Sequence, residues 1–301
     1  MSRLGMLAVL AAAVCVCAAK PLRIGYFYGQ KEYDGEGALR WLAGRMEADH
    51  GAKSVFFAGQ DVDTDTSDAT ALVIPNLGEL DSLDVLVLDV RRFWLNKAQL
   101  AKMQAFLNSG KGIVGIRAAA YAFSSWNAGF GIDSVILGGA YNGHTNDFGY
   151  DLELTAAGKA SPILAGVSPW KAGDKLYLQD YKGRTLQPDC DILMYGIQGA
   201  VRSPVAWTRV RMGSNIFNTT TGVQSDLKDP QFQKLIVNAV LWAGKSLGTT
   251  GMVRAQTPQA MSPVFAHRLA QAHYRADGRY LPAATAPAGV EALRNLPSTA
   301  K

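Results

Sequence analysis

Two continuous aliphatic segments constrain the fold of this chain most strongly: SLDVLVLDV at 82–90 and GIVGIR at 112–117. An apolar run without polar alternation is typical of a strand that is buried on both faces, as in a parallel sheet. Residues 97–112, between the two runs, repeat apolar side chains at helical spacing and reach a stop signal at Gly110. Because neighbouring parallel strands need a crossover of this kind, the order strand, helix, strand predicts an α/β fold.

Other segments extend this pattern in both directions. LRIGYFY at 22–28 predicts a first strand, and a helix is expected from Glu36. Residues 229–247 predict a closing amphipathic helix, with Asp229 as its N-cap and Pro230 at its first position. Shorter segments after residue 144 predict additional strands, several of them in hairpins: 150–155, 175–181, 191–196, 204–211 and 214–220. We therefore expect a mostly parallel central sheet with helices on both sides and extra β segments.

The two ends of the chain differ in composition from its middle. Residues 1–19 carry one early positive charge, Arg3, and then a short apolar run, which is typical of a secretory signal peptide. We expect cleavage before Lys20, with an uncleaved N-terminal anchor as the alternative. These features predict an exported protein, periplasmic or extracellular, without a stable membrane span after cleavage. Residues 20–248 are expected to form one α/β domain, and residues 249–301 an Ala- and Pro-rich extension that is partly disordered.

Charge, glycine spacing and cysteine content exclude several functions. Lys and Arg total 30 against 25 Asp and Glu, and the basic residues form no long run, so no nucleic-acid partner is expected. The glycines of GQKEYDGEG at 29–37 do not have the G-x-G-x-x-G spacing of a dinucleotide site. Signal cleavage leaves Cys190 as the one cysteine, which excludes an internal disulfide. A lone cysteine before an apolar run is more typical of a small buried residue than of a nucleophile.

Ligands of an open parallel sheet bind beyond the carboxyl ends of its strands. Polar groups gather at four predicted strand ends: the Gly29–Gln30 loop, Asp89 with Arg91 and Arg92, Arg117, and GGAYNGHTND at 138–147.

Arg117 lies at the turn where a nucleophile elbow would present a Ser or Cys. The turn reads Arg-Ala-Ala-Ala, so covalent acyl chemistry of the triad kind is not expected. The planar guanidinium can instead bind a carboxylate or sugar hydroxyls, or it can form a structural ion pair with an Asp. The sequence leaves these alternatives open.

His144 is the strongest acid/base candidate, because it is one of four histidines and lies in a polar, Gly-rich segment. Asp147 follows three residues later and could orient the imidazole. A histidine that only caps a loop is the alternative. One His and one Asp leave a third ligand missing, so no metal site is predicted, and no cofactor is assigned.

The order of several short motifs resembles that of ThuA-like (trehalose-utilisation) proteins, over roughly residues 22–245: GKGIVGIRAAAYAF, LGGAYNGH, SPILAGV, DKLY, PVAWTR and DPQFQKLIVNAVLWA. Those proteins belong to the class I glutamine amidotransferase-like superfamily, so the resemblance implies a flavodoxin-like three-layer sandwich. It also implies utilisation of a disaccharide or its 3-keto derivative, without amidotransferase activity because the elbow lacks cysteine. Arg117 matches the Arg of the family's GIR motif, and His144 matches the His of its GGxYxGH motif.

Three positions depart from the family pattern. Tyr121 stands where related proteins often have His, and Lys175 replaces the Glu of a D-E-L-Y motif. Val223 replaces the His of a T-x-L-G-H motif. If those groups make up the family's site, this chain has lost much of it.

Two functions from different classes therefore remain. In the first, an exported carbohydrate-processing enzyme, His144 moves a proton and Asp147 orients it. The sugar is then held by Arg117, Tyr141, Asn142 and Tyr121. The second is a catalytically silent member that binds a sugar or a partner protein, with Trp126, Trp170, Tyr141 and Tyr177 as aromatic candidates for stacking. A small-molecule carbohydrate is the expected ligand, and the oligomeric state stays open, a homo-oligomer included.

Overall fold

The computed structural model describes residues 20–29, 35–58, 73–126, 131–179 and 185–246. The expected signal peptide at 1–19 and the expected extension at 249–301 lie outside this part of the chain. None of the helices in the described ranges has the length and apolar character that a bilayer crossing requires.

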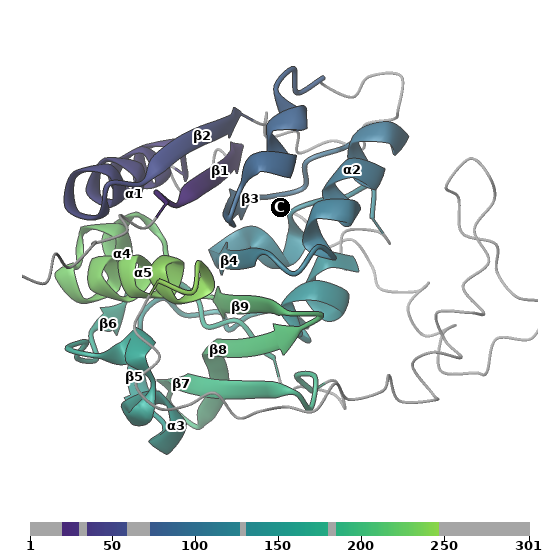
Figure 1. The fold of residues 1–301 in the computed structure, drawn as a ribbon. Helices are drawn as coiled ribbons and strands as arrows, with labels where there is room; N and C mark the ends of the chain where they lie inside the picture. The colour runs from purple at the N-terminus through teal and green to yellow at the C-terminus, as the bar shows by residue number, and fades with distance from the viewer. Residues whose placement is uncertain (1–19, 30–34, 59–72, 127–130, 180–184, 247–301) are drawn as a thin grey trace, which may run out of the picture.

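The fold is organised by one nine-stranded sheet in the order β2-β1-β3-β4-β9-β8-β7-β5-β6 (Figure 1). The strands are β1 (Arg23–Gly29), β2 (Lys53–Ala58), β3 (Val85–Val90), β4 (Gly112–Ile116), β5 (Tyr150–Leu154), β6 (Lys171–Ala172), β7 (Cys190–Gln198), β8 (Val201–Arg211) and β9 (Ser214–Thr219). The helices are α1 (Gly35–His50), α2 (Lys97–Leu107), α3 (Ala156–Ala160), α4 (Gln224–Lys228) and α5 (Pro230–Ala243). Shorter turns include the 3-10 segments η1 (Leu77–Ser82) and η2 (Arg117–Tyr121) and the π-helical turn η4 (Ile132–Leu137).

The sheet is mixed, which corrects the expectation of a mostly parallel sheet. The four pairings from β2 through β9 are parallel, and the four from β9 through β6 are antiparallel. The predicted hairpin strands join the same sheet as the parallel ones, because β9 pairs with β8 on one side and with β4 on the other. Strand β9 is therefore the seam between the two halves.

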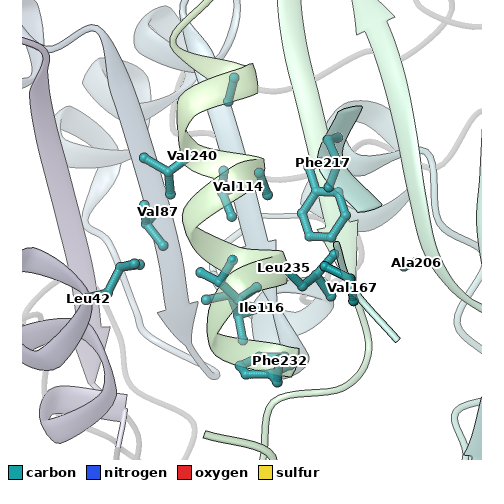
Figure 2. Packing of buried hydrophobic residues seen from close by; sticks show 14 of the residues in the cluster. Leu42, Val87, Val114, Ile116, Val167, Ala206, Phe217, Phe232, Leu235 and Val240 are labelled. Carbon is teal, nitrogen blue, oxygen red and sulfur yellow. The ribbon is translucent and has the colours of Figure 1, made fainter. Parts of the chain in front are cut away.

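Helices cover both faces of the parallel half. Helices α1 and α5 pack on one face, whereas α2 packs on the other (Figure 1). The α5 side chains Phe232 and Leu235 lie against Ile116 and Phe217 of the two central strands (Figure 2). Alternate residues of each strand enter opposite layers, so Val87 belongs to the α5 layer and Leu88 to the α2 layer.

Local sequence signals account for most boundaries. Asp229 accepts a hydrogen bond from the Gln231 N–H at the start of α5, with Pro230 in the first turn, as predicted. The chain turns with Gly110 at φ +83° between α2 and β4. The predicted strand at 175–181 is wrong over its described part, because residues 175–179 form only an isolated bridge at Tyr177. Strand β2 was not predicted.

The apolar stripe of α5 yields a stability prediction. We expect Leu235→Ala to lower the free energy of unfolding by about 3 kcal/mol, because a fully buried leucine leaves a cavity between α5 and the sheet. The neighbouring Lys234 is exposed, so Lys234→Ala should change it by no more than about 0.5 kcal/mol. Urea unfolding of both variants measures the difference, and equal losses would contradict this packing.

Candidate functional site

Polar side chains gather beyond the carboxyl ends of the central strands β4 and β9, at the sheet edge where ligands were expected. Strand β4 ends at Ile116 and β9 at Thr219, and these two residues are partners in the parallel register. Arg117 follows the first strand directly, and Thr220 follows the second. The candidate site is built on these two strand ends.

Arg117 is a buried structural clamp. Its side chain is 2% exposed and forms an ion pair of 2.5 Å with Asp174. Its guanidinium also donates to the carbonyl oxygens of Thr220 (2.7 Å) and Lys175 (3.3 Å). The residue has φ +46°, a left-handed conformation that a non-glycine side chain adopts at some cost in energy. Of the alternatives open for Arg117, the ion pair with an Asp is the one observed.

The same clamp aligns two loops. The Asn142 N–H donates to the Leu178 carbonyl, the Leu178 N–H to the Gly143 carbonyl, and the Thr145 N–H to the Leu176 carbonyl. This short antiparallel pairing places His144 opposite Tyr177. Their rings stack with centroids 6.5 Å apart. Arg117 also holds the loop of Tyr177, because its guanidinium carbon lies 3.8 Å from the centre of the Tyr177 ring.

Three tyrosines, Tyr121, Tyr141 and Tyr177, form a cluster beside this pairing. Tyr141 contacts both of the others edge to face, with centroids 4.7 Å from Tyr121 and 4.6 Å from Tyr177. The hydroxyls of Tyr121 and Tyr141 are hydrogen-bonded to each other. Burial raises the pKa of Tyr121 well above its usual range and that of Tyr141 to about 12. The hydroxyls therefore stay protonated at physiological pH and act as hydrogen-bonding groups.

A second buried carboxylate holds the loop that carries Tyr141. The fully buried Asp133 accepts a hydrogen bond of 2.9 Å from the Tyr141 N–H through Oδ2. Gln179, also fully buried, accepts from the Ala140 N–H at 2.8 Å. A Cβ on Gly139 would overlap the Asp133 carboxylate, so the glycine permits this approach. The sequence analysis did not identify Asp133, Asp174 or Gln179 as site residues. The sequence around each of them gives no indication of the residues that it contacts.

His144 is exposed, and its Nδ1 lies 2.8 Å from the carbonyl oxygen of Thr145. A carbonyl can only accept, so Nδ1 carries a proton and Nε2 is the basic nitrogen of the neutral ring. Asp147 is exposed as well, and its backbone carbonyl accepts from Thr145 and Gln198. Orientation of His144 by the Asp147 carboxylate stays a prediction.

The other regions singled out from the sequence lie at this edge or in the core. Asp89 is fully buried, with its carboxylate beside Gly35 at the start of α1. The Arg92 N–H donates to the Tyr121 carbonyl, and the charge of Arg91 acts on Tyr141. Residue 30 of the first loop lies outside the described ranges.

The aromatic candidates divide between the site and the core. Tyr141 and Tyr177 belong to the tyrosine cluster. Trp126 instead packs against the core layer of α2, and Trp170 packs against Phe232 while its indole N–H donates to Asp226. Two of the four candidates are thus core residues.

Val223 lies in a second polar centre, which is structural. The Asp226 carboxylate is 1% exposed and accepts hydrogen bonds from the Gly173, Gly222 and Val223 N–H groups. It thereby ties the start of α4 to the chain before Asp174. Val223 itself is buried at that start.

A broad depression of about 850 Å³ lies at the opposite edge of the sheet, before the amino ends of β1, β3 and β4. Four of its charged side chains form ion pairs, Arg23 with Glu79 at 3.0 Å and Lys20 with Asp84 at 3.8 Å. Within the described ranges, no group of three His, Cys, Asp or Glu side chains could hold a metal ion. The candidate chemistry therefore stays with the Arg117 edge.

Fold and site together define a class: an α/β protein with its polar site at the carboxyl ends of central strands and an arginine at the elbow position. The family model of ThuA, trehalose utilisation, matches residues 42–243, and the chain belongs to this family. A search of proteins with curated functions finds no match.

Two solved structures share the fold. A ThuA-like protein from Parabacteroides merdae ATCC 43184 aligns with a TM-score of 0.57 at 19% identity, covering 77% of this chain and 93% of that chain. A ThuA-like protein from Bacteroides uniformis ATCC 8492 aligns with a TM-score of 0.55 at 16% identity, covering 75% and 93%. At these identities the likeness shows the architecture alone.

The Arg117 clamp predicts strong coupling in unfolding experiments. Arg117→Met and Asp174→Asn should each lower the free energy of unfolding by about 3–5 kcal/mol, because each leaves a buried polar or charged partner uncompensated. The double variant should lower the free energy of unfolding by clearly less than the sum of the two single losses. The exposed pair Lys171–Asp151, at 3.6 Å, serves as the control cycle and should couple by less than about 1 kcal/mol. Additive losses at Arg117 and Asp174 would contradict the clamp.

Cys190 should be an unreactive thiol in the folded protein. Burial raises its pKa to about 12, although Arg209 acts in the opposite direction. In a C15S/C17S chain at pH 8, we expect iodoacetamide to label the native protein about 100-fold more slowly than the urea-unfolded protein, since the thiolate is the reactive form. Mass spectrometry measures the labelling, with C190A as the blank. Rapid labelling of the native state would contradict the assigned environment.

Proposed function

We propose that this protein binds a carbohydrate at the tyrosine cluster and processes it by acid/base chemistry at His144. One observation carries the proposal: the exposed imidazole is fixed between the Tyr177 ring and the Thr145 carbonyl. A general base needs a defined orientation and an accessible nitrogen. With Nδ1 engaged, Nε2 is the atom that takes a proton from a sugar hydroxyl or returns one to it.

The surroundings of His144 suit a polyhydroxylated ligand. The protonated hydroxyls of Tyr121 and Tyr141 can donate and accept hydrogen bonds, as sugar hydroxyls do. Asn142 lies between Tyr141 and His144, on the loop held by the Leu178 carbonyl. In this proposal Asn142 and the two tyrosines orient the sugar. Arg117 supports them indirectly, because its guanidinium is already engaged.

The ligand class is proposed from the family, trehalose utilisation, to which the chain belongs. A disaccharide or its 3-keto derivative is the substrate that we propose. We also propose that the parallel half has a flavodoxin-like fold, which is supported by α1 and α5 on one face of the sheet and α2 on the other. Export rests on the composition of residues 1–19.

A binding-only role is the second candidate function, and one observation favours it. Arg117 and Asp174 neutralise each other inside the clamp, so both charges are engaged in structure. Proton transfer then depends on His144, because neither charged group of the clamp is available to assist it. A protein with this arrangement can recognise a sugar without turning it over.

The two functions are separated by His144→Gln. We expect it to lower turnover of trehalose or 3-keto-trehalose by about 10²–10⁴-fold, the usual contribution of a general acid or base. His50, exposed at the end of α1, provides the matched control, and His50→Gln should leave turnover unchanged. Chromatography of the products measures turnover, and calorimetry measures binding. Binding without turnover in the native protein would favour the binding-only role, and neither activity would overturn the proposal.

A further inference from the structure

The Lys175 side chain carries a positive charge that neither the clamp nor the proposed acid/base chemistry uses. Lys175 lies two residues before Tyr177, and Leu176 between them is fully buried. Successive side chains of an extended segment point to opposite sides. Lys175 therefore lies on the same side of this segment as Tyr177, the buried ring on which the exposed His144 stacks.

An exposed aromatic ring accompanies this charge. The Lys175 ammonium lies 5.2 Å from the centre of the Phe148 ring, on the loop that also carries His144. Phe148 is 71% exposed, and its neighbour Gly149 is fixed by a hydrogen bond from its N–H to the Asp174 carbonyl. Lys175, Phe148 and His144 thus form one surface, called here the outer face.

The Lys175 ammonium is available to an anion. Among the residues that the structure describes, no carboxylate lies within ion-pair distance of it. The adjacent Asp174 is committed elsewhere, with Oδ2 on Arg117 and Oδ1 on the Lys175 N–H. A half-buried ammonium beside an exposed ring offers a charge-assisted contact together with an apolar platform.

We propose that the outer face selects a carbohydrate that bears one anionic group, a carboxylate or a phosphate. The anionic group pairs with the Lys175 ammonium, and the C–H face of the sugar ring packs on Phe148. Hydroxyls of the same ring then lie toward His144. This inference rests on the proposed function, because it names the substrate class of the same site.

The test compares four probes on the full chain by calorimetry at low salt: glucose, glucuronic acid, glucose 6-phosphate and inorganic phosphate. We expect at least one of the two anionic sugars to bind about tenfold more tightly than glucose, the usual gain from a hydrogen bond to a charged group. Lys175→Gln should remove this advantage and leave the Kd for glucose unchanged. Lys159→Gln, which removes an exposed charge on α3, should change neither the advantage of the anionic sugars nor the Kd for glucose. Phe148→Ala should weaken the binding of every sugar.

Several results would overturn the inference. Equal affinity for glucose and both anionic sugars would do so while leaving the proposed function intact, and so would an anionic preference that survives Lys175→Gln. Phosphate binding as tightly as glucose 6-phosphate would show an anion site without sugar recognition. Failure of every sugar to bind would overturn the proposed function as well. A preference for glucuronic acid or for glucose 6-phosphate identifies which anionic group the site takes.

Discussion

The buried ion pair between Arg117 and Asp174 joins three parts of the chain that are remote in sequence. Asp174 is 57 residues from Arg117, and the Thr220 carbonyl that accepts from the same guanidinium is 103 residues away. Burying a charge is costly unless hydrogen bonds and an opposite charge compensate it, and the carboxylate and two carbonyls supply both here. The strained backbone of Arg117 is tolerated because these contacts fix the residue from several sides.

The position of this pair follows from the topology. Strand β9 returns to the centre of the sheet after the antiparallel strands and lies parallel to β4, so two strand ends come together at one edge. The chain between β4 and β9 must leave that edge and come back to it. Arg117 ties the departing chain to the returning chain and to the loop at 174–178. The backbone pairing that sets His144 against Tyr177 is built on this connection.

Much of the fold was predictable, because its central strands and last helix have strong local signals. Strands β1, β3 and β4 are mostly apolar runs, and α5 begins at an Asp-Pro cap. The proportion of parallel pairing was not predictable in the same way. A hairpin segment such as β7 has the same local pattern whether it forms a second sheet or extends the first. The correct inference would have required knowing that β9 pairs with both β4 and β8.

The site was predictable only in its location. The rule for strand ends indicated Arg117 and the loop of His144, but it could not distinguish a ligand-binding guanidinium from a structural one. That distinction depends on Asp174, which lies 57 residues after Arg117 in the sequence, beyond β5, α3 and β6. Asp133 and Gln179 were not predicted either, because they accept hydrogen bonds from backbone N–H groups, and such contacts leave no sequence motif.

The candidate site thus consists of a buried layer that fixes geometry and an outer layer at which we propose that the ligand binds. The three departures from the family pattern are distributed between these two layers. Val223 is buried at the start of α4, and its backbone N–H donates to the Asp226 carboxylate, so this residue belongs to the buried layer. Tyr121 belongs to the tyrosine cluster, where its hydroxyl stays protonated and forms hydrogen bonds. Of these three residues, Lys175 alone has a charged side chain, and its backbone carbonyl accepts a hydrogen bond from Arg117 in the clamp. A side chain at this position can therefore alter which ligand is bound while the backbone contacts that hold His144 and Tyr177 remain the same.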